Sequence, residues 1–357
     1  MVATISGPRK GQGAGSNPAG RFESRRTEVF HDDWDLVEEE TPRLKIEVRE
    51  DRARSIISHN DSPDIGFDQA INPYRGCEHA CIYCFARPTH SYLNLSPGLD
   101  FETKLFYKGN AAQVLDAELR KPGYQPKIIA LGTATDPYQP IEREHRVTRS
   151  ILETLLAFRH PVGIITKGVL IERDLDLLAE MARLNLVSVG MALTTMRDEL
   201  KRDLEPRAAS GRARLRVMRQ LGDIGVPLRV MFSPVIPFVN DHEMDQVLEL
   251  AAAAGARYAS WVMLRLPYEV KDLFREWLAQ RYPLKAEHVM SLVREVRGGR
   301  DNDPNFGTRF RGSGEYANLT AQRFRLACRR NGYLEGGPAL DYRQFRVPGR
   351  GGQMSLL

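Results

Sequence analysis

Three of the four cysteines in this 357-residue chain lie within one eight-residue window. They are Cys77, Cys81 and Cys84, spaced as C-x3-C-x2-C. Thiolate is the soft ligand that iron–sulfur clusters use, and three thiolates can hold three corners of a [4Fe-4S] cube. The fourth iron would keep an open coordination position, which distinguishes a catalytic metal site from a structural one. The spacing therefore predicts a reactive iron–sulfur centre.

A structural zinc site is the alternative interpretation of these cysteines, with Cys328, His79 or His90 as the fourth ligand. Zinc ligands usually come as two separated pairs, and that spacing is absent from this motif. The ligand pattern therefore favours iron–sulfur. Cys328 falls on an amphipathic helix pattern and is interpreted as a small buried residue instead of a catalytic thiol.

The composition is that of a folded protein with one large or two modest domains, since 42% of the residues are hydrophobic. Clustered cysteines do not form a disulfide framework, and reduced thiols suit the cytoplasm. No stretch approaches the roughly 20 apolar residues that span a bilayer, and no apolar segment follows the N-terminal charges as an export signal requires. The net charge of +5 is a mild hint of a polyanionic partner.

The elements that must position the cysteines show a regular alternation. Short β-branched runs predict strands, and helical periodicity separates them. The predicted strands cover residues 67–72, 127–131, 162–166, 186–193, 228–232 and 258–264. The predicted helices cover residues 142–158, 171–183, 211–224 and 243–254, the last with one apolar face formed by Met244, Val247, Leu248 and Ala251.

Strands separated by crossover helices form a parallel sheet, so the fold class is α/β and the six βα units predict a partial (βα)6 barrel. The active site is expected at the carboxyl ends of the strands. Residues 1–62 are interpreted as a flexible N-terminal arm, disordered or ordered by substrate to about residue 30, followed by an extended lead-in. Residues 63–270 are the predicted core barrel, and residues 271–357 a mostly helical, Arg-rich C-terminal extension.

The cysteine motif, with Tyr83 directly before Cys84, resembles the signature of the radical S-adenosylmethionine superfamily, C-x3-C-x-aromatic-C. Other segments resemble the spore photoproduct lyase-like branch, and the similarity covers residues from about 55 to 330. These segments are NPYRGC at 72–77, GTATDPYQP at 132–140, TK at 166–167, LEPR at 204–207 and PVIP at 234–237.

This resemblance implies a partial (βα)6 barrel in which S-adenosylmethionine chelates the open iron of a [4Fe-4S] cluster. Reduction of the cluster, by an electron donor such as flavodoxin or ferredoxin, would break the C5′–S bond. The resulting 5′-deoxyadenosyl radical abstracts hydrogen from a substrate. The cofactor supplies the radical, and the protein supplies orientation and exclusion of side reactions.

Position by position, the resemblance implies that Cys77, Cys81 and Cys84 ligate the cluster and that Tyr83 lies near the adenine. A packed aromatic residue is the simpler interpretation of Tyr83. Residues 205–207 suit either a helix cap with an ion pair or a cofactor contact.

The ends of the second and third strands correspond to the methionine-binding part of the family site. Thr133, Thr135 and Asp136 would receive the methionine ammonium, for which a carboxylate is a suitable acceptor. Lys167 would face the methionine carboxylate. The simpler interpretations are a turn at Asp136-Pro137 and a solvated lysine.

The fourth strand departs from its relatives, which often have Ser-x-Thr-Thr where this chain has ALTT at 192–195. One hydroxyl that could bind the ribose is missing, and Thr194 is kept as a cofactor-binding residue. Pro234 and Pro237, at the end of the fifth strand, would provide apolar and backbone contacts to the adenine, with Asn240 contributing from the next turn.

Two basic segments, residues 294–311 and 323–330, are candidates for nucleic-acid binding. The first mixes arginine with phenylalanine and glycine, a composition suited to phosphate contacts and base stacking. The alternative is a solvated face. Spore photoproduct lyase is associated with a donor cysteine just after its cluster motif, whereas no cysteine follows Cys84 until Cys328. This departure argues against photoproduct repair, and DNA or RNA remains the expected substrate.

The expected function is therefore that of a radical S-adenosylmethionine enzyme acting on a nucleic-acid substrate. A second hypothesis is a non-catalytic module whose cluster braces a nucleic-acid-binding surface. The cofactor-like motifs at several strand ends favour the enzyme, because a brace would not need them.

Overall fold

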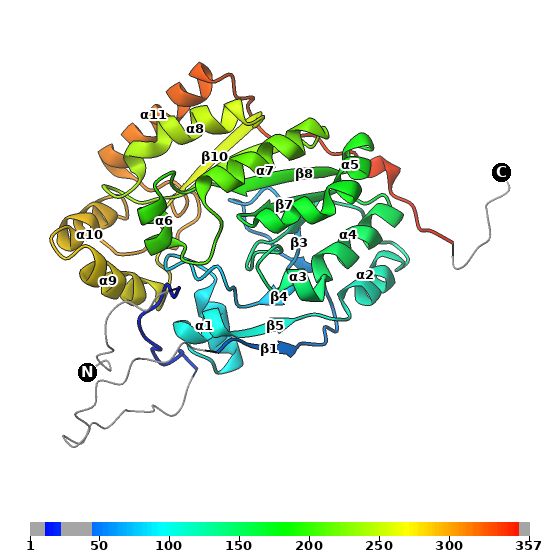
Figure 1. Cartoon of the computed structure of the whole chain (residues 1–357), viewed down its shortest axis with the longest axis horizontal. Coiled ribbons are helices and arrows are strands. Elements are labelled where there is room, and N and C mark those ends of the chain that lie inside the picture. The colour runs from blue at the N-terminus through cyan, green and yellow to red at the C-terminus, as the bar shows by residue number, and fades with distance from the viewer. Residues whose placement is uncertain (1–10, 23–44, 350–357) are drawn as a thin grey trace.

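The computed structural model describes residues 11–22 and 45–349, and a seven-stranded sheet runs through its centre (Figure 1). The strand order is β10-β9-β8-β7-β6-β3-β2. All neighbouring pairs from β3 to β10 are parallel, and β2 pairs antiparallel with β3. The strands are β2 (Ser58–His59), β3 (Gln69–Ile71), β6 (Ile129–Leu131), β7 (Val162–Thr166), β8 (Val187–Ala192), β9 (Leu228–Val235) and β10 (Tyr258–Met263).

The six parallel strands confirm the α/β fold and all six strands predicted from the sequence. The sheet is open, because β2 and β10 form its two edges. Along β7 and β9, buried residues alternate with half-buried ones, so one face of the sheet is packed more tightly than the other. Ile129 and Leu131 of β6 and Val187 of β8 lie on the tightly packed face and are fully buried.

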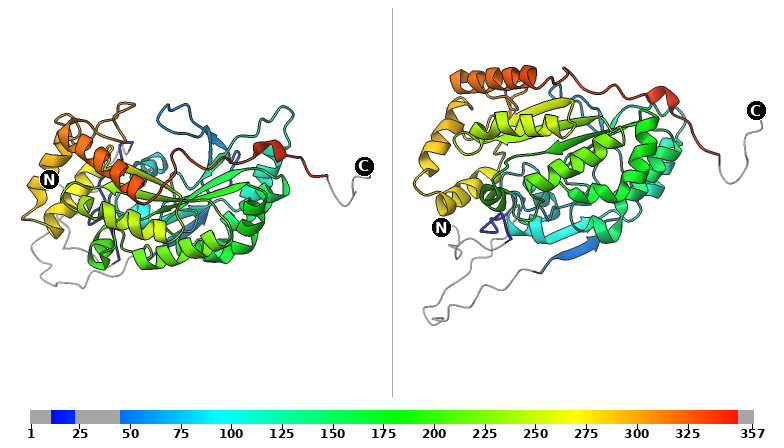
Figure 2. Two further views of the ribbon diagram at one scale, coloured as in Figure 1. Left: turned by 90° about the horizontal axis from the view of Figure 1, so that it is seen from above. Right: turned by 45° about the horizontal axis from the view of Figure 1, so that its top comes forward.

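Helices follow the parallel strands and cover one face of the sheet, as the view from above shows (Figure 2). The α-helices are α1 (Leu99–Thr103), α2 (Ala111–Leu119), α3 (Glu142–His145), α4 (Val147–Ala157), α5 (Leu175–Arg183), α6 (Asp198–Leu204), α7 (Gly211–Asp223), α8 (Met244–Ala253), α9 (Val270–Arg281), α10 (Ala286–Glu295) and α11 (Gly314–Arg330). The 3-10 helices are η1 (Arg87–Leu93), η2 (Val169–Asp174), η3 (Asp241–Glu243) and η4 (Tyr342–Gln344).

Two predicted helices differ in detail from those observed. The helix expected at 142–158 is broken into α3 and α4 at Arg146, whose φ of 51° is left-handed. The first turns of the helix expected at 171–183 form the 3-10 helix η2. The apolar face of α8 is confirmed, because Met244, Val247, Leu248 and Ala251 are all fully buried.

A second, three-stranded sheet lies beside the first and was not predicted from the sequence. Its order is β1-β5-β4, with β1 (Glu47–Glu50) parallel and β4 (Tyr74–Arg75) antiparallel to β5 (Lys104–Tyr107). Strand β4 directly precedes the cysteine motif. The small sheet therefore fixes the start of the cysteine loop.

Residues 11–22 correct the expectation of an N-terminal arm without structure of its own. The backbone N–H groups of Gly13 and Ala14 donate to the carboxylate of Glu102, over 3.0 and 2.8 Å. Ser16 donates to Glu276 on α9. Ala14 and Ser16 are buried. Sequence composition misses this docking because it depends on distant acceptors; the other residues before 45 lie outside the described part of the chain.

A side-chain clasp joins the two edges of the open sheet. Asp64, in the loop between β2 and β3, accepts hydrogen bonds from the Gly307 amide over 2.8 Å and from Arg309 Nε over 2.7 Å. Arg309 also donates to Ser62. Residues 307–309 follow α10, on the β10 side of the molecule. We call these contacts the Asp64–Arg309 clasp.

Three helices, α9, α10 and α11, follow the barrel strands, as the expected helical extension predicts (Figure 1). Helix α11 packs against α8. Within residues 11–22 and 45–349, no helix is both long enough and apolar enough to cross a bilayer.

Candidate active site

The cysteine loop follows β4 at the carboxyl edge of the main sheet. Its turns are held by main-chain hydrogen bonds, including Cys77 N–H to Phe101 O over 3.0 Å and Cys84 N–H to Cys81 O over 3.2 Å. Ala80 has a left-handed φ of 57°. Cys77 and Cys81 are buried, whereas Cys84 is half-buried. The loop thus carries three free thiols, of which that of Cys84 is the most accessible to solvent.

A fully buried arginine, Arg87, fixes the carbonyl groups of this loop. Its Nε donates to Cys81 O over 2.9 Å, and its Nη1 donates to Pro97 O and Gly98 O over 3.1 and 2.9 Å. The guanidinium also pairs with Glu102, which is itself buried. A buried charge needs such complete pairing to be tolerated. Arg87 therefore acts as an internal brace for the cysteine loop.

The three thiols are close enough for their charges to interact. Burial is the main cause that raises the pKa of Cys77, and Cys81 and Cys84 raise it further. Burial likewise raises the pKa of Cys81 to about 12. In the described part of the chain, no three His, Cys, Asp or Glu side chains could hold a metal ion as a single-ion site. The cluster that the motif predicts would use each thiolate as the ligand of a different iron.

Cys328 lies apart from the other three cysteines. It is on α11, packed against the main apolar core, and burial alone accounts for the rise in the pKa of its thiol to about 11. His90 is also committed elsewhere, since its Nε2 lies 2.9 Å from Lys104 O. These positions give no support to a zinc site completed by either residue.

Asp136 lies just after β6 and is held by groups from two strand ends. It accepts hydrogen bonds from Thr166 Oγ over 2.6 Å, from the Lys167 amide over 2.8 Å and from the Tyr138 amide over 2.9 Å. His79 Nδ1 lies 3.3 Å from the same carboxylate. Although burial opposes its charge, His79 and these hydrogen bonds hold the pKa of Asp136 well below its usual range. Asp136 is therefore an ionised link between the cysteine loop and β7.

Thr133 and Thr135 are ordered by Asn72, which follows β3. Asn72 Oδ1 accepts the Ala134 amide over 2.7 Å, and its Nδ2 donates to Thr133 Oγ over 3.2 Å. Thr135 Oγ donates to Tyr74 O over 3.2 Å. Gly132 is required here: its φ is 92°, and a Cβ would lie 2.5 Å from Ile165 O. The loop after β6 is thus set before any ligand binds.

Lys167 follows β7. Within residues 11–22 and 45–349, no group accepts a hydrogen bond from its ammonium or forms an ion pair with it. Although burial opposes the charge, Cys81 and Glu205 raise the pKa of Lys167, and Asp136 adds to this effect. An ionised, half-buried ammonium beside the cysteine loop can receive an anionic ligand group.

A buried network around Glu205 lies on the other side of the cysteine loop. Glu205 follows α6 and accepts hydrogen bonds from the Tyr83 hydroxyl and from Thr194 Oγ, the latter over 2.8 Å. It also pairs with Arg214 of α7. Burial alone would raise the pKa of Glu205, but Arg214 and Lys167 lower it to about 2. The sequence interpretation left Glu205 between a cap and a cofactor contact and missed Arg214 altogether.

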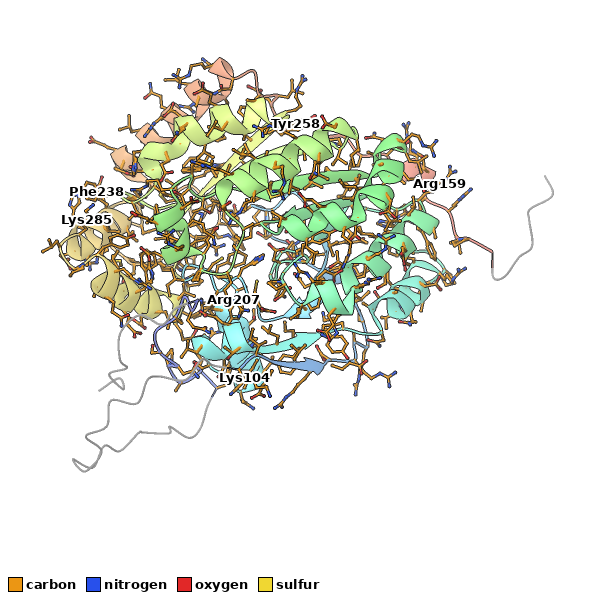
Figure 3. The ribbon with its side chains drawn as sticks, viewed as in Figure 1. Lys104, Arg159, Arg207, Phe238, Tyr258 and Lys285 are labelled. Atoms are coloured by element: carbon orange, nitrogen blue, oxygen red, sulfur yellow. The ribbon has the colours of Figure 1, made fainter. Side chains whose placement is uncertain are left out.

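Tyr83 and Thr194 face inward in this network, since both are buried. Burial and the neighbouring Glu205 raise the pKa of Tyr83 well above its usual value. Arg207, labelled in Figure 3, pairs with Glu78 of the cysteine loop over 2.6 Å. The LEPR segment therefore contacts the cysteine loop through two side chains, Glu205 to Tyr83 and Arg207 to Glu78. Main-chain hydrogen bonds from Ile82 N–H to Leu204 O and from Arg207 N–H to His79 O add to these contacts.

Asn240 holds together the ends of β8 and β9. Its Nδ2 donates to Thr194 O and Pro234 O, both over 2.9 Å, and its Oδ1 accepts the Ile236 amide over 2.7 Å. Pro234 and Pro237 are buried in the same turn. The residues expected at strand ends therefore lie within the last residues of β9 or just after β6, β7, β8 and β9, on the edge of the sheet that carries the cysteine loop.

Comparisons with known proteins agree with this arrangement. The family model described as the radical SAM superfamily matches residues 71–251. An uncharacterized protein of Mycobacterium tuberculosis (strain ATCC 25618 / H37Rv) is 41% identical over 230 residues, which cover 64% of this chain and 68% of that protein. An uncharacterized protein of Methanocaldococcus jannaschii is 28% identical over 245 residues, covering 69% of this chain and 87% of that protein.

Solved structures with the same fold include spore photoproduct lyase complexed with dinucleoside spore photoproduct. The match covers 80% of both chains with a TM-score of 0.58 and 15% sequence identity. A variant of that enzyme with bound AdoMet and dinucleoside spore photoproduct matches with a TM-score of 0.57 and 15% identity over the same share of each chain. The chain belongs to the radical SAM superfamily, and it is an enzyme of the kind that uses a [4Fe-4S] cluster and S-adenosylmethionine.

Proposed function

We propose that Cys77, Cys81 and Cys84 hold the [4Fe-4S] cluster and that the enzyme abstracts hydrogen from a nucleic-acid substrate. The observation that carries the proposal is the convergence of three interacting thiols with the unpartnered ammonium of Lys167. When bound, the cluster supplies the electron that cleaves S-adenosylmethionine into methionine and a 5′-deoxyadenosyl radical. An electron donor such as flavodoxin or ferredoxin would reduce the enzyme.

The residues around the thiols are proposed to bind the two ends of the methionine moiety. Lys167 binds the carboxylate, because its charge has no partner within the described protein. The loop at Thr133, Thr135 and Asp136 receives the ammonium, with the ionised Asp136 lowering the cost of a positive charge nearby. Asp136 also orients His79 and the Lys167 amide, so it acts in part by positioning.

The adenosine end is proposed to lie against the turn after β9. Pro234 and Pro237 would form the apolar wall of the adenosine site. The Tyr83–Glu205–Thr194 network would fix the position of this wall relative to the cysteine loop. Ionised Glu205 stays paired with Arg214, so the network holds its shape over a wide pH range. Because Ala192 stands where relatives often have serine, no hydroxyl is present there to bind the ribose, and Thr194 would position the ribose instead.

A nucleic-acid substrate is supported by the arginine-rich stretch after α10 and by the fold shared with spore photoproduct lyase. Cys328 lies on α11, apart from the cysteine loop, which supports a reaction other than that enzyme's repair. Reduced thiols support a cytoplasmic location for the chain.

The test is production of 5′-deoxyadenosine by protein purified without oxygen, reconstituted with iron and sulfide, and supplied with dithionite and S-adenosylmethionine. Mass spectrometry should detect the nucleoside with the native chain and with the Cys328→Ala control. The Cys81→Ala variant should form none and bind less iron. Equal iron content and cleavage in Cys81→Ala would sink the ligand assignment. A loaded cluster that never cleaves S-adenosylmethionine, even with oligonucleotides present, would favour a non-catalytic module.

A further inference from the structure

A ladder of alternating aromatic rings and guanidinium groups begins beside the cysteine loop. Arg265, just after β10, lies over the ring of Phe85 at 5.8 Å and over that of Phe310 at 4.8 Å. Arg309 lies over Phe310 at 4.9 Å and over Phe306 at 4.6 Å. Phe85 directly follows Cys84 in the sequence. The ladder therefore leads from the most accessible of the three cysteines to residues beyond α10.

The two ends of the ladder are open to solvent. The exposed fraction is 51% for Phe85 and 60% for Phe306. If the ladder served only to pack residues 306–310 onto β10, its terminal rings would be expected to be covered. Exposed rings at both ends of a stack are available for a further flat, aromatic group.

Arg265 carries a charge that the described protein does not neutralise. No carboxylate among those residues forms an ion pair with it, and its buried Nε has no hydrogen-bond partner. Burial lowers the pKa of Arg265, and the neighbouring Arg309 lowers it further. The nearby Asp64 is engaged by Arg309. A buried donor without an acceptor is costly, so Arg265 is suited to an anionic group on a ligand.

We propose that the ladder formed by Phe85, Arg265, Phe310, Arg309 and Phe306 binds a single-stranded nucleic acid. Bases stack on the exposed rings, and a backbone phosphate binds Arg265. Rings interleaved with cations are how single strands are bound without a fixed sequence. The end at Phe85 delivers one nucleotide to the cysteine loop. The binding of the strand is independent of the proposed function; only the reaction of the bound nucleotide rests on it.

The experiment measures binding of fluorescein-labelled single-stranded DNA and RNA oligonucleotides by anisotropy, at several salt concentrations and without S-adenosylmethionine. Phe306→Ala should weaken binding about five- to a hundredfold, the usual range for loss of one stacked base. Arg265→Gln should weaken binding and should reduce the slope of log K against log salt by about 0.7, the value of one single-strand phosphate contact. Duplex DNA of the same length should bind more weakly than the single strand.

Two variants serve as matched controls. Phe238 is 47% exposed and lies beside Lys285, at a cation–ring distance of 5.7 Å (Figure 3). Arg183 is an exposed arginine of α5, outside both basic segments, with no ion pair to a described residue. Phe238→Ala and Arg183→Gln should bind single strands as the native chain does. Circular dichroism and iron content confirm that all four variants are folded.

Ladder variants that bind like the controls would overturn the inference, as would a native chain that fails to bind single strands. Displacement of the strand by nucleoside monophosphate at equal concentration would mean that the ladder binds a free nucleotide and not a strand, which would also overturn the inference. The inference would stand and the proposed function would fall if the ladder variants lose binding while the native chain never cleaves S-adenosylmethionine. The binding experiment and the cleavage experiment therefore test the two proposals separately.

Discussion

The Nε of Arg87 donates a hydrogen bond to the carbonyl oxygen of Cys81 over 2.9 Å. The second cysteine of the motif is thus held from behind by a side chain six residues later. The charge that does this is buried, and Glu102 balances it while also receiving the amides of Gly13 and Ala14. One ion pair therefore connects the cysteine loop to the N-terminal segment.

Arg87→Met should lower both stability and iron content. Removing one partner of a buried ion pair costs about 3–5 kcal/mol, because the other charge stays buried. Urea unfolding and iron analysis measure the effect. Arg216→Met is the control, since the Arg216–Glu172 pair is exposed and should contribute about 1 kcal/mol or less.

A double variant, Arg87→Met with Glu102→Gln, separates charge balance from support of the loop. It should regain part of the stability that Arg87→Met loses, because no buried charge is left unpaired. Its iron content should stay low, because the hydrogen bond to Cys81 O is still missing. Full recovery of iron would show that Arg87 does not position the loop.

Lys167→Met should raise the KM for S-adenosylmethionine about 10- to 100-fold and change kcat less. A hydrogen bond to a charged group contributes about 1.5–3 kcal/mol, and here it would be made mainly on binding. Rates of 5′-deoxyadenosine formation over a range of cofactor concentrations give both constants. Lys121→Met, at an exposed site away from the strand ends, should leave both unchanged. A fall in kcat alone would contradict a binding role.

His160 should make the chain less stable as the solution is acidified. Burial lowers its pKa to about 4 from the ordinary 6.5, and its Nε2 lies 2.8 Å from the Tyr124 hydroxyl. Between pH 6.5 and pH 4, His160 therefore binds a proton in the unfolded chain but not in the folded chain. Its contribution to the free energy of unfolding is fully present above pH 6.5 and is lost as the pH falls toward 4. The difference corresponds to about 3 kcal/mol.

Urea midpoints of the native chain and of His160→Gln, measured from pH 7 to pH 4.5, check this expectation. The variant should be less stable at pH 7 and should lose less stability on acidification. Parallel slopes would mean that other groups cause the acid sensitivity.

Gly13→Ala should release the N-terminal segment from the cysteine loop. A Cβ at this position would lie 1.8 Å from Ala80 O, a distance that requires the backbone to move. Overpacking of this kind costs about 1–3 kcal/mol. Hydrogen exchange should increase at residues 13–16 and in the cysteine loop. Gly66→Ala, whose Cβ would meet no atom within 4 Å, should exchange as the native chain does.

The sequence was sufficient to predict the family, through the spacing of its cysteine motif, the six parallel strands, and the edge of the sheet at which the cysteine loop lies. These depend on local spacing and on periodic apolar runs, which a single sequence displays directly. Arg87, Glu102 and Arg214 could not be found in this way. In the sequence they look like ordinary surface charges, and their function depends on partners that only the folded chain brings close.

The small second sheet escaped prediction for a related reason. Strands β1, β4 and β5 are two to four residues long, too short for an alternating pattern to stand out. Helices α3 and α4 were predicted as one, because their apolar positions continue across Arg146 without a Gly or Pro to mark the break. Tertiary contacts decide both cases.

The Asp64–Arg309 clasp has a consequence for the way a long molecule reaches the thiols. The clasp joins the β2 side of the sheet to the β10 side through side chains and one loop amide, and no strand pairing of the sheet depends on it. Parting these groups would let the two edges of the open sheet separate while every strand keeps its neighbour. Under the proposed function, a nucleic-acid strand would then enter from the side at any point along its length, and catalysis would not require a free end.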